Sequence, residues 1–268
     1  MILMNDFKAE PPELREAMLQ ATSRVLESGW YVLGSEVKQF EQQWSRVCGV
    51  SHGIGVANGM DAIEIAILGL SIGEGDEVIT TPMTAFATIL AIIRSGAKPV
   101  LADIDLETAL LSTESVRRCL SPKTKAIVLV HLYGQVRQMD KWVKFCEENK
   151  IILIEDCAQA HLATWQGKVS GSFGQAGAYS FYPTKNLGAV GDAGMLVTSD
   201  STLAKKARRL RNYGQSERYL HPVIGMNSRL DEVQAAMLSE RMKWLLEFTK
   251  RRRQIADKYH SKIDNPYV

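Results

Sequence analysis

Short apolar runs recur through the middle of the chain, and their residues are apolar at successive rather than alternate positions. Between about residues 50 and 200 these runs are separated by segments with helical periodicity, such as 84–96 and 139–149. Parallel strands that are covered by helices on both faces show this pattern, which therefore predicts an α/β domain. The strands predicted in this way are residues 77–82, 99–105, 125–134, 151–157, 177–183 and 194–200.

Helical patterns flank this block on both sides. Residues 11–48 predict an amphipathic helix, a glycine-containing turn and a second helix, which we expect to pack on the core. Residues 230–260 predict one long helix, and its basic run at 250–253 is most simply a solvated helix face.

The composition narrows the class of protein. Of the 268 residues, 46% are hydrophobic and 23% are charged, and the formal net charge is +2. These are ordinary values for a folded protein, and they argue against a surface that binds nucleic acid. The N-terminus lacks the pattern of a signal peptide and no later run reaches membrane-spanning length, so we expect a cytoplasmic protein without membrane association.

The cysteine and histidine spacings predict neither a disulfide framework nor a metal site. The chain has no CxxC and no HExxH motif. The four cysteines are Cys48, Cys119, Cys146 and Cys157.

Candidate chemistry lies just after the predicted strands, because ligands of open α/β sheets bind beyond the carboxyl ends of the strands. Asp156 ends the apolar run IILIED, where its carboxylate could hold the proton of a pyridinium ring. A cap for a following helix is an equally good interpretation of this aspartate. Gln159, three residues later, could face the same ring.

Lys185 follows the run AYSFYP in the segment YPTKNLG, five residues after Ser180. Most lone loop lysines are solvated charges. Partial burial beside a cationic ring would disfavour the charged form, however, and the resulting neutral amine could form an imine. The closely spaced glycines Gly188, Gly191 and Gly194 also indicate a backbone that passes close to other groups.

A phosphate site is possible at Gly59, Met60 and Asp61, immediately before the helical run AIEIAILGL. A glycine at a helix N-terminus exposes backbone N–H groups to an anion, although a simple helix cap is the commoner role. His131 and His161 also lie near strand ends, where each could line a pocket or be structural.

Taken in order, these segments resemble the DegT/DnrJ/EryC1/StrS family of sugar aminotransferases. The resemblance runs through nearly the whole chain. The blocks that carry it are VANGMDAIEIAI (56–67), GAKPVLADID (96–105), VHLYGQ (130–135), IEDCAQAHLA (154–163), GSFG (171–174), YSFYPTKNLGAVGDAG (179–194), and LRNYGQSERY followed by IGMNSRLDEVQAAML (210–238).

The resemblance implies a fold-type I transferase that depends on pyridoxal 5′-phosphate (PLP), with three α/β/α layers and a mostly parallel seven-stranded sheet. Residues 1–235 would form the large PLP-binding domain, with 1–50 as a helical segment packed on it. Residues 236–268 would form a linking long helix and the start of a truncated C-terminal small domain.

The resemblance also assigns roles. Lys185 matches the Schiff-base lysine, Asp156 the acid that pairs with the pyridine nitrogen, and Gln159 the residue next to the ring oxygen. The remaining cofactor contacts would be Gly59, Met60, Asp61, Ser180 and, from the partner subunit of a homodimer, Asn227. Substrate contacts are expected at His161 and Arg229. Trp30 and Tyr31, after Gly29, could line the substrate pocket or could equally be packing residues.

The implied reaction moves an amino group from an amino acid, usually glutamate, to a nucleotide-linked keto-(deoxy)sugar, for cell-surface polysaccharide, including lipopolysaccharide, or amino-sugar biosynthesis. The sequence departs from the family pattern in two residues: Met60 replaces a hydroxyl residue, and Ala85 replaces an aromatic residue that stacks on the ring, with Phe86 beside it. The chain also ends earlier than family members do. The alternative is a non-catalytic PLP-binding protein or an inactive truncated member of the family.

Overall fold

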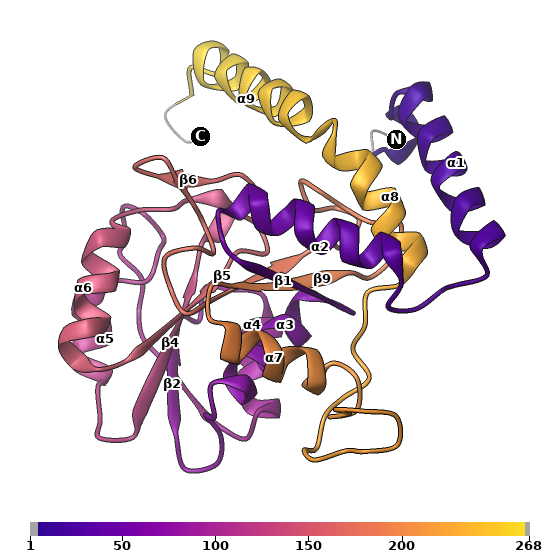
Figure 1. Cartoon of the computed structure of the whole chain (residues 1–268). Coiled ribbons are helices and arrows are strands. Elements are labelled where there is room, and N and C mark those ends of the chain that lie inside the picture. The colour runs from indigo at the N-terminus through magenta and orange to yellow at the C-terminus, as the bar shows by residue number, and fades with distance from the viewer. Residues whose placement is uncertain (1–4, 266–268) are drawn as a thin grey trace.

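The computed structural model describes residues 5–265 and has a seven-stranded sheet at its centre (Figure 1). The strand order is β1-β9-β8-β5-β4-β2-β3, and β9 runs antiparallel to both neighbours while the other pairs are parallel. This confirms the mostly parallel seven-stranded sheet. The strands are β1 His52–Val56, β2 Glu77–Thr80, β3 Lys98–Leu101, β4 Thr124–Val130, β5 Ile152–Asp156, β8 Ala176–Ser180 and β9 Gly194–Thr198, and a separate hairpin consists of β6 Thr164–Trp165 and β7 Lys168–Val169.

Helices cover the two faces of the sheet, which gives the three layers that the sequence predicts (Figure 1). In β4, Ile127 and Leu129 belong to one hydrophobic core, whereas Ala126 and Val128 belong to the other. Both faces are therefore buried, and this explains why the strands are apolar at successive positions. One core includes α2 Ser35–Cys48, α5 Thr113–Cys119 and α6 Met139–Asn149, and the other includes α3 Gly59–Gly69, α4 Phe86–Arg94 and α7 Ser201–Leu210.

β1 is not among the strands that the hydrophobic pattern predicts, because its sequence HGIGV alternates apolar residues with glycine. Both glycines meet neighbouring groups closely. A Cβ atom added at Gly53 would lie 2.7 Å from the carbonyl oxygen of Glu41, and one at Gly55 would lie 2.9 Å from Leu230 Cβ. The glycines thus allow α2 and the residue before α8 to approach the strand.

The chain ends pack together on one side of the molecule. The helix α1 (Pro12–Ser28) lies against α8 (Glu232–Met242), which also contacts α2. The prediction of one helix over residues 230–260 is wrong, because α8 ends at Met242 and α9 spans Leu245–Lys262. At the junction, Lys243 and Trp244 donate backbone hydrogen bonds to carbonyls three residues back, which tightens the turn. Short 3₁₀ turns occupy Phe7–Ala9 and Leu132–Gly134.

Among residues 5–265, no helix combines the length and the apolar character that crossing a bilayer requires.

Candidate active site

The strands β4, β5 and β8 are parallel neighbours, so their carboxyl ends lie at one edge of the sheet. Asp156 is the last residue of β5 and Ser180 is the last residue of β8. Lys185 follows in the connection between β8 and β9. The structure therefore places these three predicted residues on neighbouring segments at the same edge.

The Asp156 carboxylate is buried and has two donors. Its Oδ2 accepts a hydrogen bond of 2.8 Å from the Thr88 hydroxyl, and its Oδ1 accepts one of 3.1 Å from the Ala158 N–H. Asp156 caps no helix, since the following described residues 157–163 contain none. The cap interpretation is therefore wrong. Thr88, which is not among the predicted site residues, lies 2.7 Å from the Thr84 hydroxyl.

The Lys185 side chain is half-buried, and its amine has no hydrogen-bond or ion-pair partner among the described residues. Burial lowers the pKa of Lys185, and the negative charge of Asp156 opposes part of that effect. The backbone N–H of Lys185 donates to the Tyr182 carbonyl at 2.8 Å, which closes a turn after β8. The turn thus presents an amine that loses its proton more readily than an exposed lysine does.

The helix α3 begins at Gly59, as the sequence predicts. Asn58 caps it, because its side chain accepts a hydrogen bond of 2.8 Å from the Asp61 N–H. That N–H is therefore not available to a ligand, whereas the N–H groups of Gly59 and Met60 donate to no other described residue. A Cβ atom at Gly59 would lie 2.7 Å from Ser180 Cβ, so glycine allows the helix start and the end of β8 to meet.

A pocket of about 730 Å³ opens beside Lys185. Gln159 and His161 line it together with Lys185, and the Gln159 Oε1 atom accepts a hydrogen bond of 2.9 Å from the Tyr133 N–H. The residues predicted for the ring nitrogen and the phosphate lie outside its lining: Gly59, Met60, Asp61, Asp156 and Ser180.

His161 lies deep in this region, with 4% of its surface exposed. Neither ring nitrogen has a hydrogen-bond partner among the described residues. Its ring packs among aromatic side chains, with centroids 5.6 Å from Trp44 and 5.5 Å from Tyr179. Burial lowers the pKa of His161 to about 3; the positive charges of Lys185 and Arg252 add to the effect, and the Ser180 backbone opposes it. The imidazole is therefore neutral at physiological pH.

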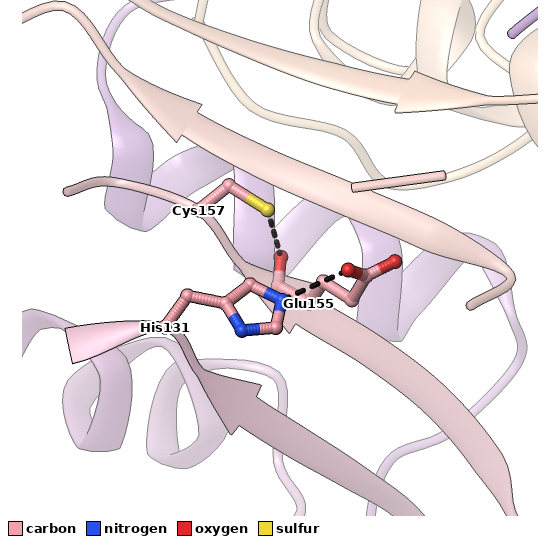
Figure 2. Close-up of side chains that lie close together, drawn as sticks. All are labelled: His131, Glu155 and Cys157. Carbon is pink, nitrogen blue, oxygen red and sulfur yellow. Dashed lines mark hydrogen bonds and ion pairs between the residues drawn. The ribbon is translucent and has the colours of Figure 1, made fainter. Parts of the chain in front are cut away.

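His131 belongs to a buried network with Glu155 and Cys157 (Figure 2). His131 Nε2 lies 2.9 Å from Glu155 Oε2, and the Cys157 thiol donates to the Glu155 carbonyl at 3.8 Å. Burial acts to raise the pKa of Glu155, but its hydrogen bonds and the charge of His131 outweigh burial and lower that pKa overall. The other donors to the carboxylate are the N–H groups of Gly171, Phe173 and Gly174, at 2.8, 2.7 and 2.8 Å.

Because four donors already occupy the Glu155 carboxylate, we interpret this network as structural. Burial also raises the pKa of Cys157 well above its ordinary value, so its thiol stays protonated.

The remaining predicted residues lie outside the pocket. Trp30 and Tyr31 are exposed, and the Trp30 indole donates to the Val32 carbonyl at 2.8 Å. Arg229 donates to Asn212 Oδ1 at 3.2 Å, and Asn227 is exposed and forms a β-bridge with Asn212.

No ring-stacking residue was assigned from the sequence. Phe86, the first residue of α4, is 67% exposed and follows Ala85.

The chain is similar to sugar transaminases over nearly its whole length. It is 45% identical over 268 residues to dTDP-3-amino-3,6-dideoxy-α-D-galactopyranose transaminase of Aneurinibacillus thermoaerophilus. That alignment covers 100% of this chain and 74% of the relative. It is also 44% identical over 256 residues to a pleiotropic regulatory protein of Geobacillus stearothermophilus, covering 96% of this chain and 69% of the relative.

The fold is similar as well. The crystal structure of Streptomyces venezuelae DesV in complex with a ketimine intermediate superposes with a TM-score of 0.92 at 42% identity, over 96% of this chain and 69% of that one. The model of the DegT/DnrJ/EryC1/StrS aminotransferase family matches residues 12–266. The chain therefore belongs to the DegT/DnrJ/EryC1/StrS aminotransferase family.

Proposed function

We propose that this protein binds PLP through Lys185 and transfers an amino group from an amino acid, glutamate, to a nucleotide-linked keto-sugar. The observation that carries the proposal is the half-buried amine of Lys185, which has no partner among the described residues. Burial lowers its pKa, and the negative charge of Asp156 opposes part of that effect. The names of the transaminase relatives support the class of substrate.

The residues at the sheet edge fit PLP by the chemistry of their donors. Lys185 supplies an amine for the aldehyde, and Asp156 supplies a buried carboxylate for the ring nitrogen. The unoccupied N–H groups of Gly59 and Met60, with the Ser180 hydroxyl next to Gly59, would hold the phosphate. When bound, PLP supplies a protonated ring that withdraws electrons from the substrate carbon.

Each residue would then have a definite task. Asp156, held by Thr88, would keep a proton on the ring nitrogen. Lys185, whose amine loses its proton more readily than that of an exposed lysine, would attach the cofactor and carry a proton between the substrate carbon and the cofactor. Gln159, whose side-chain oxygen accepts from the Tyr133 N–H, would face the ring oxygen.

Asn227 is exposed, and we propose that it reaches the cofactor phosphate of a second subunit in a homodimer. The substrate roles of Trp30, Tyr31 and Arg229 and the division into 1–235 and 236–268 stay predictions. The place of the reaction in polysaccharide or amino-sugar biosynthesis is part of the same proposal.

The test is borohydride reduction of the purified protein after incubation with PLP, followed by peptide mass spectrometry. We expect the pyridoxyl adduct on Lys185, none at that site in Lys185→Ala, and an unchanged adduct in the exposed control Lys123→Ala. An adduct at another lysine, or none, would contradict the proposal.

The response to added glutamate then distinguishes an active transaminase from a protein that only binds PLP. The visible absorbance of the bound cofactor should fall when glutamate is added to an active transaminase. A protein that only binds PLP keeps this absorbance, and an inactive member of the family forms no adduct.

A further inference from the structure

The pocket beside Lys185 is lined by cations without acids. Arg137, Arg252 and Arg253 line it with Lys185, and no lining residue is an aspartate or glutamate. None of these three arginines has an ion pair or a side-chain hydrogen bond with another described residue. The pocket therefore carries positive charge that the described chain does not neutralise.

Some other arginines of this chain are paired. Arg94 lies 2.9 Å from Glu64, and Arg211 pairs with Glu41. Burial lowers the pKa of Arg252, and the nearby charge of Arg241 lowers it further. The Arg252 side chain is nonetheless exposed, and a bound anion would favour its charged form.

The cations come from two distant parts of the sequence. Arg137 follows the turn Leu132–Gly134 after β4, whereas Arg252 and Arg253 lie on α9. The fold thus brings guanidinium groups from two segments far apart in the sequence to the same pocket. A guanidinium presents a planar set of donors that matches phosphate oxygens, and several such groups together suit a ligand with more than one negative charge.

His161 gives an independent sign that a ligand binds here. It is buried and lines the same pocket, and neither ring nitrogen makes a hydrogen bond of normal geometry with a described residue, although the nearby Ser180 backbone acts to raise its pKa. A buried polar group without a hydrogen bond is costly, so a ligand hydroxyl at this position would relieve the cost. Because the ring is neutral, it suits a sugar hydroxyl better than a phosphate.

We propose that Arg137, Arg252 and Arg253 bind the diphosphate of the nucleotide-linked substrate, while His161 hydrogen-bonds its sugar. The identity of this ligand rests on the proposed function. A pocket of about 730 Å³ is larger than the carboxylate of an amino-acid donor needs, and three guanidinium groups exceed the pairing capacity of one carboxylate. The diphosphate is therefore the better match.

Calorimetric titration with dTDP, UDP and GDP tests this subsite. Each nucleoside diphosphate is compared with the corresponding nucleoside, which lacks the phosphates. We compare the wild type with Arg137→Gln and with the double variant Arg252→Gln/Arg253→Gln, with and without PLP. The control is Lys250→Gln, which removes a positive charge from the same helix outside this pocket. We expect the tightest diphosphate to bind about 10-fold or more weakly to each arginine variant, with nucleoside affinity and the Lys250 control unchanged.

Three results would overturn the proposal. The first is that the wild type binds none of the three diphosphates, and the second is that the variants bind them as tightly as the wild type. The third is that Arg252→Gln/Arg253→Gln loses only the response to glutamate, which would assign the arginines to the amino donor. Because nucleotide binding is read without PLP, it stays distinct from the trapping test. Loss of diphosphate binding in the variants supports the subsite even where Lys185 forms no adduct.

Discussion

The hydroxyl of Thr88, in the first turn of α4, donates a 2.8 Å hydrogen bond to Oδ2 of Asp156 at the end of β5. Both residues are buried. The bond links the helix that follows β2 to the carboxylate proposed for the ring nitrogen, and it fixes the orientation of that carboxylate before any ligand binds. A hydrogen bond to a charged group contributes about 1.5–3 kcal/mol.

Replacing Thr88 with valine should therefore lower the free energy of unfolding by about 2 kcal/mol, because it removes a donor from a buried carboxylate. It should also weaken PLP binding. Urea unfolding followed by tryptophan fluorescence measures the first effect, and titration with PLP the second. Thr88→Ser keeps the hydroxyl and should behave like the wild type. Equal stability of the valine variant would show that this bond contributes little.

The sequence could predict most of the sheet, because the central strands are buried on both faces and are therefore apolar at successive positions. It could not predict β1, because Gly53 and Gly55 interrupt the run of apolar residues. Glycine is needed at these positions because neighbouring residues pack too closely for a side chain. Thr88 was equally hidden, since a threonine in the apolar helix 86–94 looks like part of the core. Its partner lies 68 residues away, and only the fold brings the two together.

Capping shows the same limit. The helix α2 has no side-chain cap from its own N-terminal residue, Gly34. The carboxylate of Glu232 instead accepts hydrogen bonds from the N–H groups of Gly34, Glu36 and Val37. A local motif search cannot find a cap that lies 198 residues from the helix start. The strand-end residues were predictable because parallel topology alone places them together.

His161 should make stability depend on pH. Its folded pKa of about 3 is below the ordinary value of 6.5, so the unfolded chain binds the proton first as the pH falls. The neutral His161 ring therefore contributes to the free energy of unfolding fully above about pH 7, and this contribution is lost as the pH falls toward 3. The loss between pH 7 and 5 is about 2 kcal/mol. His161→Phe keeps an aromatic ring but cannot bind a proton, so it should remove this part of the dependence of the free energy of unfolding on pH. Urea unfolding at several pH values measures it.

The exposed His260 provides the control for that experiment. His260→Asn should leave the pH dependence as in the wild type, because it replaces an exposed side chain and leaves the buried His161 ring in place. If His161→Phe and the wild type lose stability in parallel between pH 7 and 5, the neutral buried imidazole is not the cause.

Glu155 should be far more important for stability than an exposed acid. Glu155→Gln removes the charge that faces His131 and turns an amide toward backbone donors, so we expect a loss of about 3–5 kcal/mol in the free energy of unfolding (Figure 2). The matched control is Glu114→Gln, which breaks an exposed pair with Arg118 and should cost about 0.5 kcal/mol or less. Similar losses in the two variants would contradict the structural role of the network.

Replacing Met60 with threonine should improve binding of the cofactor phosphate. Its N–H and that of Gly59 are unoccupied at the start of α3, but its side chain adds no donor there. Met60→Thr adds a hydroxyl at this position and should tighten binding of pyridoxamine phosphate roughly 3- to 10-fold, since hydrogen bonds to a charged phosphate are stronger than neutral ones. Met60→Val provides the same branching without the hydroxyl and should show no gain. Calorimetric titration measures both variants, and an equal gain in the two would assign the effect to packing rather than to a phosphate contact.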